Sequence, residues 1–118
     1  MDLGWGRRER LGCGGGSAGG LLVGNAIARR PDLWHVCLAD VPFVDLMVTM
    51  ADPSIPLTAG EWTEWGNPHD AKFYECMVGY SPMQMIKEGV RYPNMLICAG
   101  LHDPRVAYWE PAKFAAHM

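Results

Sequence analysis

The residues from Gly15 to Gly19 are G-G-S-A-G and fit the pattern G-x-S-x-G. In this pattern a serine occupies a sharp turn between a strand and a helix, where its hydroxyl can act as a nucleophile. Small residues are needed on both sides because a larger side chain would strike the neighbouring strand or helix. The backbone N–H of Ala18 would face the oxyanion that develops during acyl transfer. The segment therefore predicts acyl transfer with Ser17 as the nucleophile.

The same glycines also fit the dinucleotide-binding pattern G-x-G-x-x-G, as Gly14, Gly16 and Gly19. Asp40 follows Gly19 by 21 positions, about where an acid that binds the cofactor ribose is expected. A glycine-rich turn that packs closely and performs no chemistry is a third possibility. The spacing favours the serine hypothesis but leaves all three open.

Asp103 follows an apolar run at residues 94–100 that is typical of a buried strand. Functional side chains gather just past the carboxyl ends of strands in parallel sheets. Asp103 also comes 86 residues after Ser17, which agrees with the chain order serine, acid, histidine. A dinucleotide domain needs no acid there, so Asp103 favours the serine hypothesis. The alternative is a solvated turn aspartate before Pro104.

The elements around the glycines form a βαβ pattern. Residues 9–13 predict a short strand, residues 19–30 a helix stopped by Pro31, and residues 35–39 a buried strand. Such a unit belongs to a parallel sheet with flanking helices.

The remainder of the chain is less regular. Short helices are predicted at residues 44–50 and 71–78, with a long surface loop at 52–70 between them. A helix is predicted again at residues 109–118. Only about three strands can be counted, fewer than in a complete α/β sheet. We therefore expect a partial α/β fold with a mainly parallel sheet, as a piece of a larger domain.

Composition limits the class of protein. The 118 residues are 49% hydrophobic and 19% charged, a balance typical of a folded domain. The net charge of −3 argues against a nucleic-acid partner, which favours a basic surface. No apolar run approaches the roughly 18 residues of a membrane span, so no membrane partner is expected.

Cys13, Cys37, Cys76 and Cys98 have no C-x-x-C pairing and no metal-binding spacing with histidine. We interpret them as structural thiols of a protein in a reducing compartment, the cytoplasm. Serine acyl transfer needs neither a metal nor an organic cofactor, and none is expected.

Three longer stretches follow one another along the chain: GGSAGGLLVGNAIARRPDLWHVCLADVPFVD, DPSIPLTAGEWTEWGNP and YPNMLICAGLHDPRVAYWEPAKF. Together they resemble the C-terminal part of the prolyl oligopeptidase family of serine peptidases. The resemblance covers nearly everything from residue 11 to residue 118 and leaves residues 1–10 as a divergent segment. It implies that residues 11–118 are a fragment of an α/β-hydrolase catalytic domain, which in this family is capped by a β-propeller.

The resemblance implies a role for each candidate residue. Ser17 would be the nucleophile, Asp103 the acid that orients the catalytic histidine, and the N–H of Ala18 one oxyanion donor. Arg105 matches the arginine that binds a substrate carbonyl oxygen. Glu61, in the segment G-E-W, matches the carboxylate that pairs with a basic P1 side chain. The implied substrates are short peptides cleaved after arginine or lysine.

The segment around Glu61 departs from the family in one position. Related chains often carry a second acid two residues on, where this chain has Thr63. A preference for basic residues would then be weaker, or would rest on Glu61 and Glu64. Trp62 and Trp65 either line the substrate pocket or cover the core, which is the commoner use of tryptophan.

No histidine stands where the catalytic base is expected. His35 and His69 precede Asp103, His102 adjoins it, and His117 follows it by only 14 positions, within a predicted helix. In the family the histidine lies beyond the next strand, and a second oxyanion donor, a tyrosine, lies upstream. We therefore expect an incomplete catalytic unit that needs the rest of the catalytic domain and the propeller. A noncatalytic, hydrolase-like interaction module remains an alternative.

Overall fold

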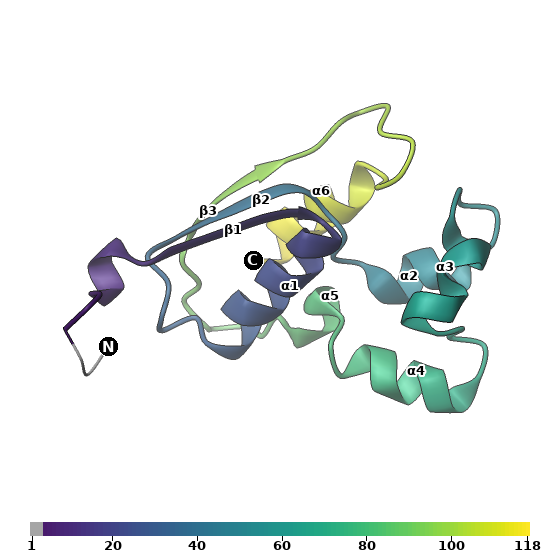
Figure 1. Ribbon diagram of the computed structural model, residues 1–118, viewed down its shortest axis with the longest axis horizontal. Coiled ribbons are helices and arrows are strands. Elements are labelled where there is room, and N and C mark those ends of the chain that lie inside the picture. Colours follow the sequence, from purple (N-terminus) through teal and green to yellow (C-terminus); the bar gives the residue numbers. More distant parts are fainter. Residues whose placement is uncertain (1–3) are drawn as a thin grey trace.

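The chain begins with a βαβ unit in the computed structural model, which describes residues 4–118 (Figure 1). β1 (Gly12–Ser17) leads directly into α1 (Ala18–Arg29), and β2 (Val36–Pro42) returns parallel to β1. The predicted helix and second strand are confirmed to within a few residues.

The first strand begins later than the sequence predicted and shares only Gly12 and Cys13 with the predicted range 9–13. Residues 1–3 of the divergent segment lie outside the described part of the chain, and Arg8–Arg10 form a 3₁₀ turn. β1 instead runs through the glycine cluster. β2 comes so close that a Cβ on Gly16 would lie 2.9 Å from the carbonyl oxygen of Asp40. The low strand propensity of glycine hid this strand.

The sheet has three parallel strands in the order β1-β2-β3, with β3 (Asn94–Cys98) paired to β2. One face packs against α1 and α6 (Trp109–His117), which lie on the same side of the sheet in Figure 1. The opposite face leaves three apolar side chains 41%, 52% and 58% exposed: Val36, Leu38 and Leu96. The predicted partial α/β fold with a parallel sheet is confirmed.

Three short helices lie beyond the carboxyl ends of the strands (Figure 1): α2 (Leu46–Ala51), α3 (Thr58–Trp65) and α4 (Ala71–Val78). α2 and α4 confirm the helices predicted at residues 44–50 and 71–78. α5 (Pro82–Met85) packs on α1 and was not predicted, because prolines in this region look like breaks. Here Pro82 starts the helix, a position that proline favours.

α3 corrects the prediction of a long loop at residues 52–70. Two hydrogen bonds to the end of α2 hold this helix in place: the hydroxyl of Thr58 donates to the carbonyl oxygen of Thr49 at 3.0 Å, and the indole N–H of Trp62 to that of Met50 at 3.0 Å. Gly60 weakens helix propensity in between. Tertiary contacts outweigh the local preference, so the sequence pattern did not reveal the helix.

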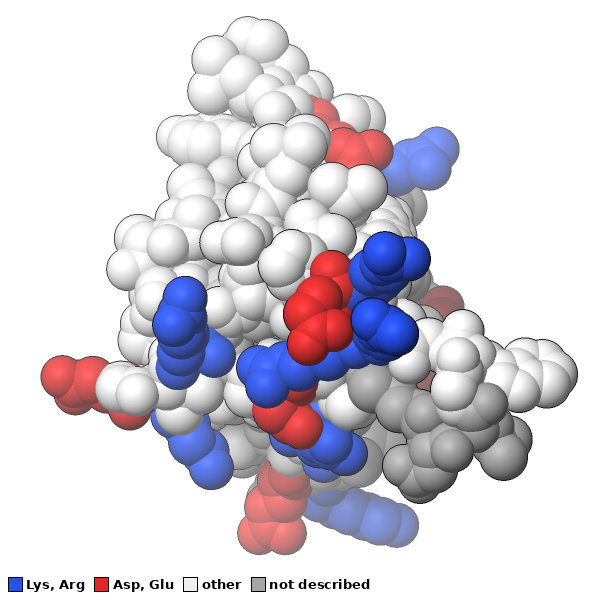
Figure 2. Space-filling view, turned by 90° about the vertical axis from the view of Figure 1, so that its left-hand side faces the viewer, with Lys and Arg blue, Asp and Glu red and all other residues white. Residues whose placement is uncertain are grey.

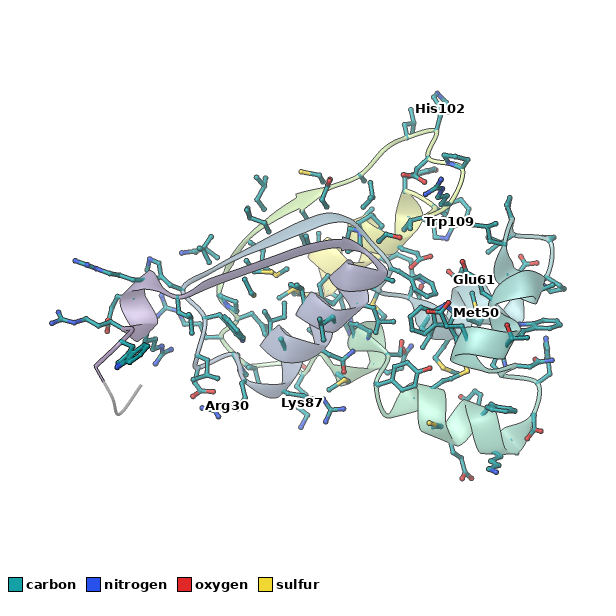
Figure 3. The ribbon with its side chains drawn as sticks, viewed as in Figure 1. Arg30, Met50, Glu61, Lys87, His102 and Trp109 are labelled. Carbon is teal, nitrogen blue, oxygen red and sulfur yellow. The ribbon has the colours of Figure 1, made fainter. Side chains whose placement is uncertain are left out.

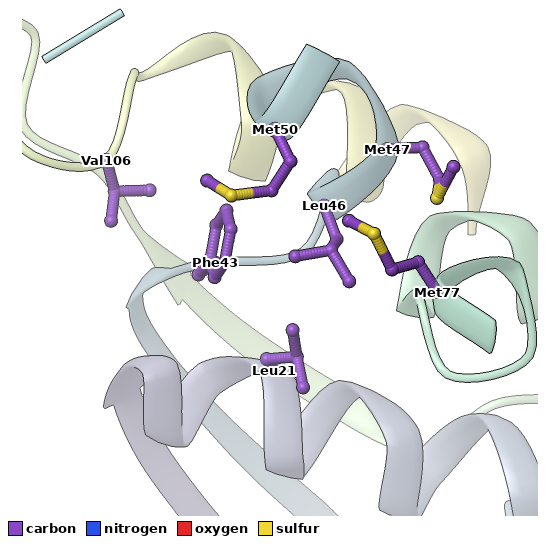
Figure 4. Close-up of a cluster of buried hydrophobic side chains, with 7 residues drawn as sticks. All are labelled: Leu21, Phe43, Leu46, Met47, Met50, Met77 and Val106. Carbon is purple, nitrogen blue, oxygen red and sulfur yellow. The ribbon is translucent and has the colours of Figure 1, made fainter. Parts of the chain in front are cut away.

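A hydrophobic cluster joins these helices to the sheet and to the loop after β3 (Figure 4): Leu21, Phe43, Leu46, Met47, Met50, Met77 and Val106. Full burial of a side chain of this size contributes about 1.5–3 kcal/mol. Trp62 and Trp65 pack against the cluster, so both cover the core, and Trp65 also lines the cavity described below. The cluster fixes α2 and α3 against the carboxyl end of the sheet.

All four cysteines are free. Burial raises the pKa of the Cys37 thiol to about 12, and also raises the pKa of Cys13, its partner on β1. The interpretation as structural thiols fits these two residues. Cys76 and Cys98 are exposed in this chain.

Figure 2 shows one end of the molecule, where Lys and Arg side chains are interspersed with Asp and Glu. Among residues 4–118, no helix is long and apolar enough to cross a membrane.

Candidate active site

Ser17 is the last residue of β1 and directly precedes α1. Its backbone has φ 53° and ψ −125°, a conformation that residues with a side chain rarely adopt. A Cβ on Gly15 would lie 2.5 Å from the carbonyl oxygen of Gly19, and one on Gly20 would lie 2.5 Å from Pro42. The structure therefore has the predicted strained turn between strand and helix, with no room for a side chain at Gly15 or Gly20. Gly19 differs from the expectation, because a Cβ there would have no atom within 4 Å.

Ala18 is the first residue of α1. The N–H groups in the first turn of a helix have no partner within the helix, and the helix dipole favours negative charge there. Ser17 and Ala18 both line a cavity of about 310 Å³ at the carboxyl end of the sheet. A negative oxygen formed beside Ser17 would thus lie near a helix N-terminus.

Asp103 lies in the loop between β3 and α6. Its Oδ1 accepts hydrogen bonds from the backbone N–H groups of Arg105 at 2.8 Å and Val106 at 2.9 Å. These donors lower the pKa of Asp103, so the carboxylate stays charged at neutral pH. The other oxygen, Oδ2, is the one left for a further partner such as an imidazole N–H.

The cavity of about 310 Å³ brings together four predicted site residues: Ser17, Ala18, Glu61 and Arg105. Asp103 lines an adjoining cavity, which Ser17 and Arg105 also border. Residues separated by more than 80 positions in the sequence therefore meet at one edge of the sheet. What each of these residues can do depends on the hydrogen bonds that hold it at this edge of the sheet.

Glu61 lies on α3 and is half-buried. Its Oε2 accepts a hydrogen bond from the indole N–H of Trp65 at 3.1 Å, which holds the carboxylate at the cavity (Figure 3). Glu64, three positions on and on the same face of the helix, also lines the cavity. Thr63 is exposed and donates to the carbonyl oxygen of Gly60 at 3.3 Å. The cavity wall therefore carries two carboxylates and no basic side chain other than Arg105 among the lining residues.

Sequence reasoning did not identify the residues that complete the cavity. Phe43, just after β2, and Thr49 and Met50 of α2 line it. Phe43 could have been found, because it follows a strand at the edge where site residues gather. Thr49 and Met50 left no such signal, since their place depends on how α2 packs.

The histidines lie away from Ser17. His35 precedes β2, at the opposite end of the sheet, and the ring of His69 contacts the carbonyl oxygen of Ala51 at 3.2 Å. His102 is on the exposed tip of the loop after β3 (Figure 3), and His117 is exposed at the end of α6. Within the described residues, no histidine lines either cavity beside Ser17.

The dinucleotide alternative fits the geometry poorly. Gly14 and Gly16 are paired within β1, whereas the fingerprint needs them in the turn after the strand. Asp40 pairs with Gly16 inside β2 and does not lie beyond its end. The part of the chain that the structure describes also has no group of three or more His, Cys, Asp or Glu side chains that could hold a metal ion.

Comparison with known proteins agrees with this fold. The sequence model of the Prolyl oligopeptidase family matches residues 1–118, and the chain belongs to this family. It is 45% identical over 118 residues to Protease 2 of Moraxella lacunata, covering 100% of this chain and 17% of that protein. It is 44% identical over 115 residues to dipeptidyl aminopeptidase BI of Pseudoxanthomonas mexicana, covering 98% of this chain and 16% of that protein.

Solved structures of oligopeptidase B are also similar. The enzyme from Leishmania major matches with a TM-score of 0.95 and 55% identity, over 98% of this chain and 16% of its own. The enzyme from Trypanosoma brucei, in a closed form with covalently bound antipain, matches with a TM-score of 0.94 and 59% identity, over 98% of this chain and 16% of its own. The chain thus spans about a sixth of the length of the proteins it matches.

Proposed function

We propose that this chain is part of a larger serine-type peptidase, called the complete protein below, that hydrolyses short peptides through an acyl-enzyme on Ser17. The observation that carries the proposal is the strained turn of Ser17, with a helix N-terminus on one side and charged Asp103 on the other. In the complete protein, a β-propeller and the rest of the α/β-hydrolase domain would accompany residues 11–118.

In the proposed reaction, Ser17 Oγ attacks the carbonyl carbon of the scissile bond. Its proton passes to a histidine outside this chain and from there to the leaving amine. The N–H of Ala18 stabilises the oxyanion, and Asp103 orients the histidine and stabilises its charged form. Water then hydrolyses the acyl-enzyme and releases Ser17.

We further propose cleavage after arginine or lysine, with Glu61 pairing with the basic P1 side chain. Glu61 is half-buried, and apolar Met50 and Trp65 share its cavity. A partly desolvated carboxylate binds a guanidinium more strongly than an exposed one, and can do so through two parallel hydrogen bonds. Arg105, on the same cavity, would bind a carbonyl oxygen of the substrate backbone.

The chain alone would be inactive in this scheme, because no described histidine reaches Ser17. Removal of a catalytic base costs an enzyme about 10⁶-fold in turnover. A noncatalytic interaction module would share the inactivity, but would remain inactive in the complete protein as well.

The test is labelling of the complete protein with a fluorophosphonate, followed by peptide mass spectrometry. We expect the probe on Ser17 and cleavage of arginyl peptides, with no label after Ser17→Ala. No label on Ser17 of a folded complete protein would refute the proposal. NAD binding that is lost on Asp40→Ala would support the dinucleotide alternative instead.

A further inference from the structure

Glu110 is a fully buried carboxyl group at the start of α6. Burial raises its pKa, and it lies beside a second buried acid, Asp45, which pairs with Lys113. A buried acid of this kind is costly unless hydrogen bonds satisfy it. The hydrogen-bond partners of Glu110 therefore indicate the role of this buried carboxyl group.

The oxygens of Glu110 bind the residues just before α2 and a side chain within that helix. Oε2 accepts the backbone N–H groups of Val44 at 3.1 Å and Asp45 at 3.0 Å, and Oε1 accepts the hydroxyl of Thr49 at 2.5 Å. Asp45, the residue that precedes α2, makes no capping hydrogen bond with its own side chain. Glu110 instead binds the N–H groups of Val44 and of Asp45 itself, just before the helix, from more than 60 positions away in the sequence.

α2 in turn supports the acidic wall of the cavity. Thr49 and Met50 line the cavity, and their carbonyl oxygens accept the hydrogen bonds of Thr58 and Trp62 on α3. Glu61 is next to Trp62 on the same helix. A continuous set of hydrogen bonds therefore runs from Glu110 through α2 to α3.

Glu110 is also close in sequence to the catalytic acid. It follows Asp103 by seven positions, at the point where the loop after β3 becomes α6. Val106, between them, packs in the same cluster as Phe43 and Met50. Glu110 thus ties the loop of Asp103 to the wall that carries Glu61.

We infer that Glu110 is a positioning residue for substrate choice, which holds α2 and α3 so that Glu61 meets the P1 side chain. This inference rests on the proposed function. A buried acid that serves only to keep α6 folded would affect every substrate equally. A positioning residue changes the preference for basic over uncharged P1 side chains.

The test uses the complete protein and two peptide substrates that differ at P1, arginine in one and norleucine in the other. Glu110→Met keeps the side-chain length and removes both acceptor oxygens. We expect the ratio of kcat/KM for arginine over norleucine to fall roughly 10- to 100-fold, because small misplacements of a binding group have effects of this size. Labelling of Ser17 by a fluorophosphonate should keep its rate.

Two further variants separate positioning from folding. Glu110→Gln retains an oxygen for the two backbone N–H groups and an NH₂ for Thr49 Oγ, so the ratio should stay near wild type. Ala112→Gly, at an exposed position of α6, weakens the helix without touching α2 and should also leave the ratio unchanged. Should Glu110→Met fail to fold, Glu110→Asp, which keeps the carboxyl group but is shorter, takes its place.

Amide hydrogen exchange gives a readout that does not need activity. We expect faster exchange in residues 44–51 and 58–65 of Glu110→Met, and wild-type exchange in Glu110→Gln. The inference would be overturned if Glu110→Met left the amide exchange or the ratio of kcat/KM unchanged. It would also be overturned if Ala112→Gly lowered that ratio as much as Glu110→Met does. A wild-type protein without arginine preference would refute the proposed specificity, while the exchange would still decide whether Glu110 holds α2 and α3.

Discussion

The strand ends that carry Ser17 and Asp103 are built differently from the helical wall that carries Glu61. Ser17 and Asp103 are held by their own neighbours: a strained turn between glycines, and two N–H groups within three residues. Glu61 lies on a helix held by partners on a different helix, α2. The difference separates two tasks, since the strand ends would set the rate of acyl transfer and the wall would set the choice of substrate.

Single substitutions in the complete protein can test whether the strand ends set the rate and the wall sets the choice of substrate. A change at the strand ends should slow the cleavage of all peptides to the same extent. A change in the wall should alter only the preference for basic P1 residues. Four substitutions test it, from the largest expected effect to the smallest.

Ser17→Ala should have the largest effect, because it removes the atom that attacks the substrate. We expect kcat to fall about 10⁶-fold for arginyl and norleucyl peptides alike. Steady-state kinetics with both peptides measures this. A loss confined to arginyl peptides would show that Ser17 binds P1 and does not attack.

Asp103→Asn should lower kcat about 10⁴-fold for both peptides, because a neutral amide neither orients nor stabilises the charged histidine. The amide oxygen can still accept the N–H groups of Arg105 and Val106, so the loop should keep its fold. Backbone donors lower the pKa of Asp103, so the carboxylate is ionised throughout the neutral range and the loss should persist there. A variant with wild-type rates would remove Asp103 from the catalytic group.

Glu61→Gln should lower kcat/KM for arginyl peptides roughly 10- to 200-fold, since a hydrogen-bonded charged pair contributes about 1.5–3 kcal/mol. Norleucyl peptides should be cleaved as before. Glu75→Gln is the matched control, because Glu75 lies on exposed α4 and does not line the cavity. Equal losses for both peptides would contradict the division of tasks.

Glu64→Gln should have the smallest effect of the four, about two- to fivefold on arginyl peptides, because exposed ion pairs contribute about 0.2–1 kcal/mol. Glu64 lines the cavity but is exposed. For comparison, Thr63→Glu should change the arginine preference less than Glu64→Gln does, since Thr63 is not among the residues that line the cavity. A larger gain from Thr63→Glu than the loss from Glu64→Gln would show that substrate reaches past the cavity wall.

The same contrast explains what the sequence revealed. The turn at Ser17 and the acid after β3 depend on nearby residues, so a short motif and its position after a strand were enough to predict their geometry. The pattern around Glu61 predicts a loop where the structure has a helix, because the support of that helix comes from Thr49 and Met50 on another element. Glu110 gave no signal at all, since its partners on α2 lie more than 60 positions away.

The most direct test of the account is a crystal structure of the complete protein with a peptide aldehyde that has arginine at P1. The account predicts a covalent bond from Ser17 Oγ to the aldehyde carbon, with the resulting oxygen at the N–H of Ala18 and the guanidinium at Glu61. A covalent bond to another residue, or a guanidinium that lies away from Glu61, would contradict it.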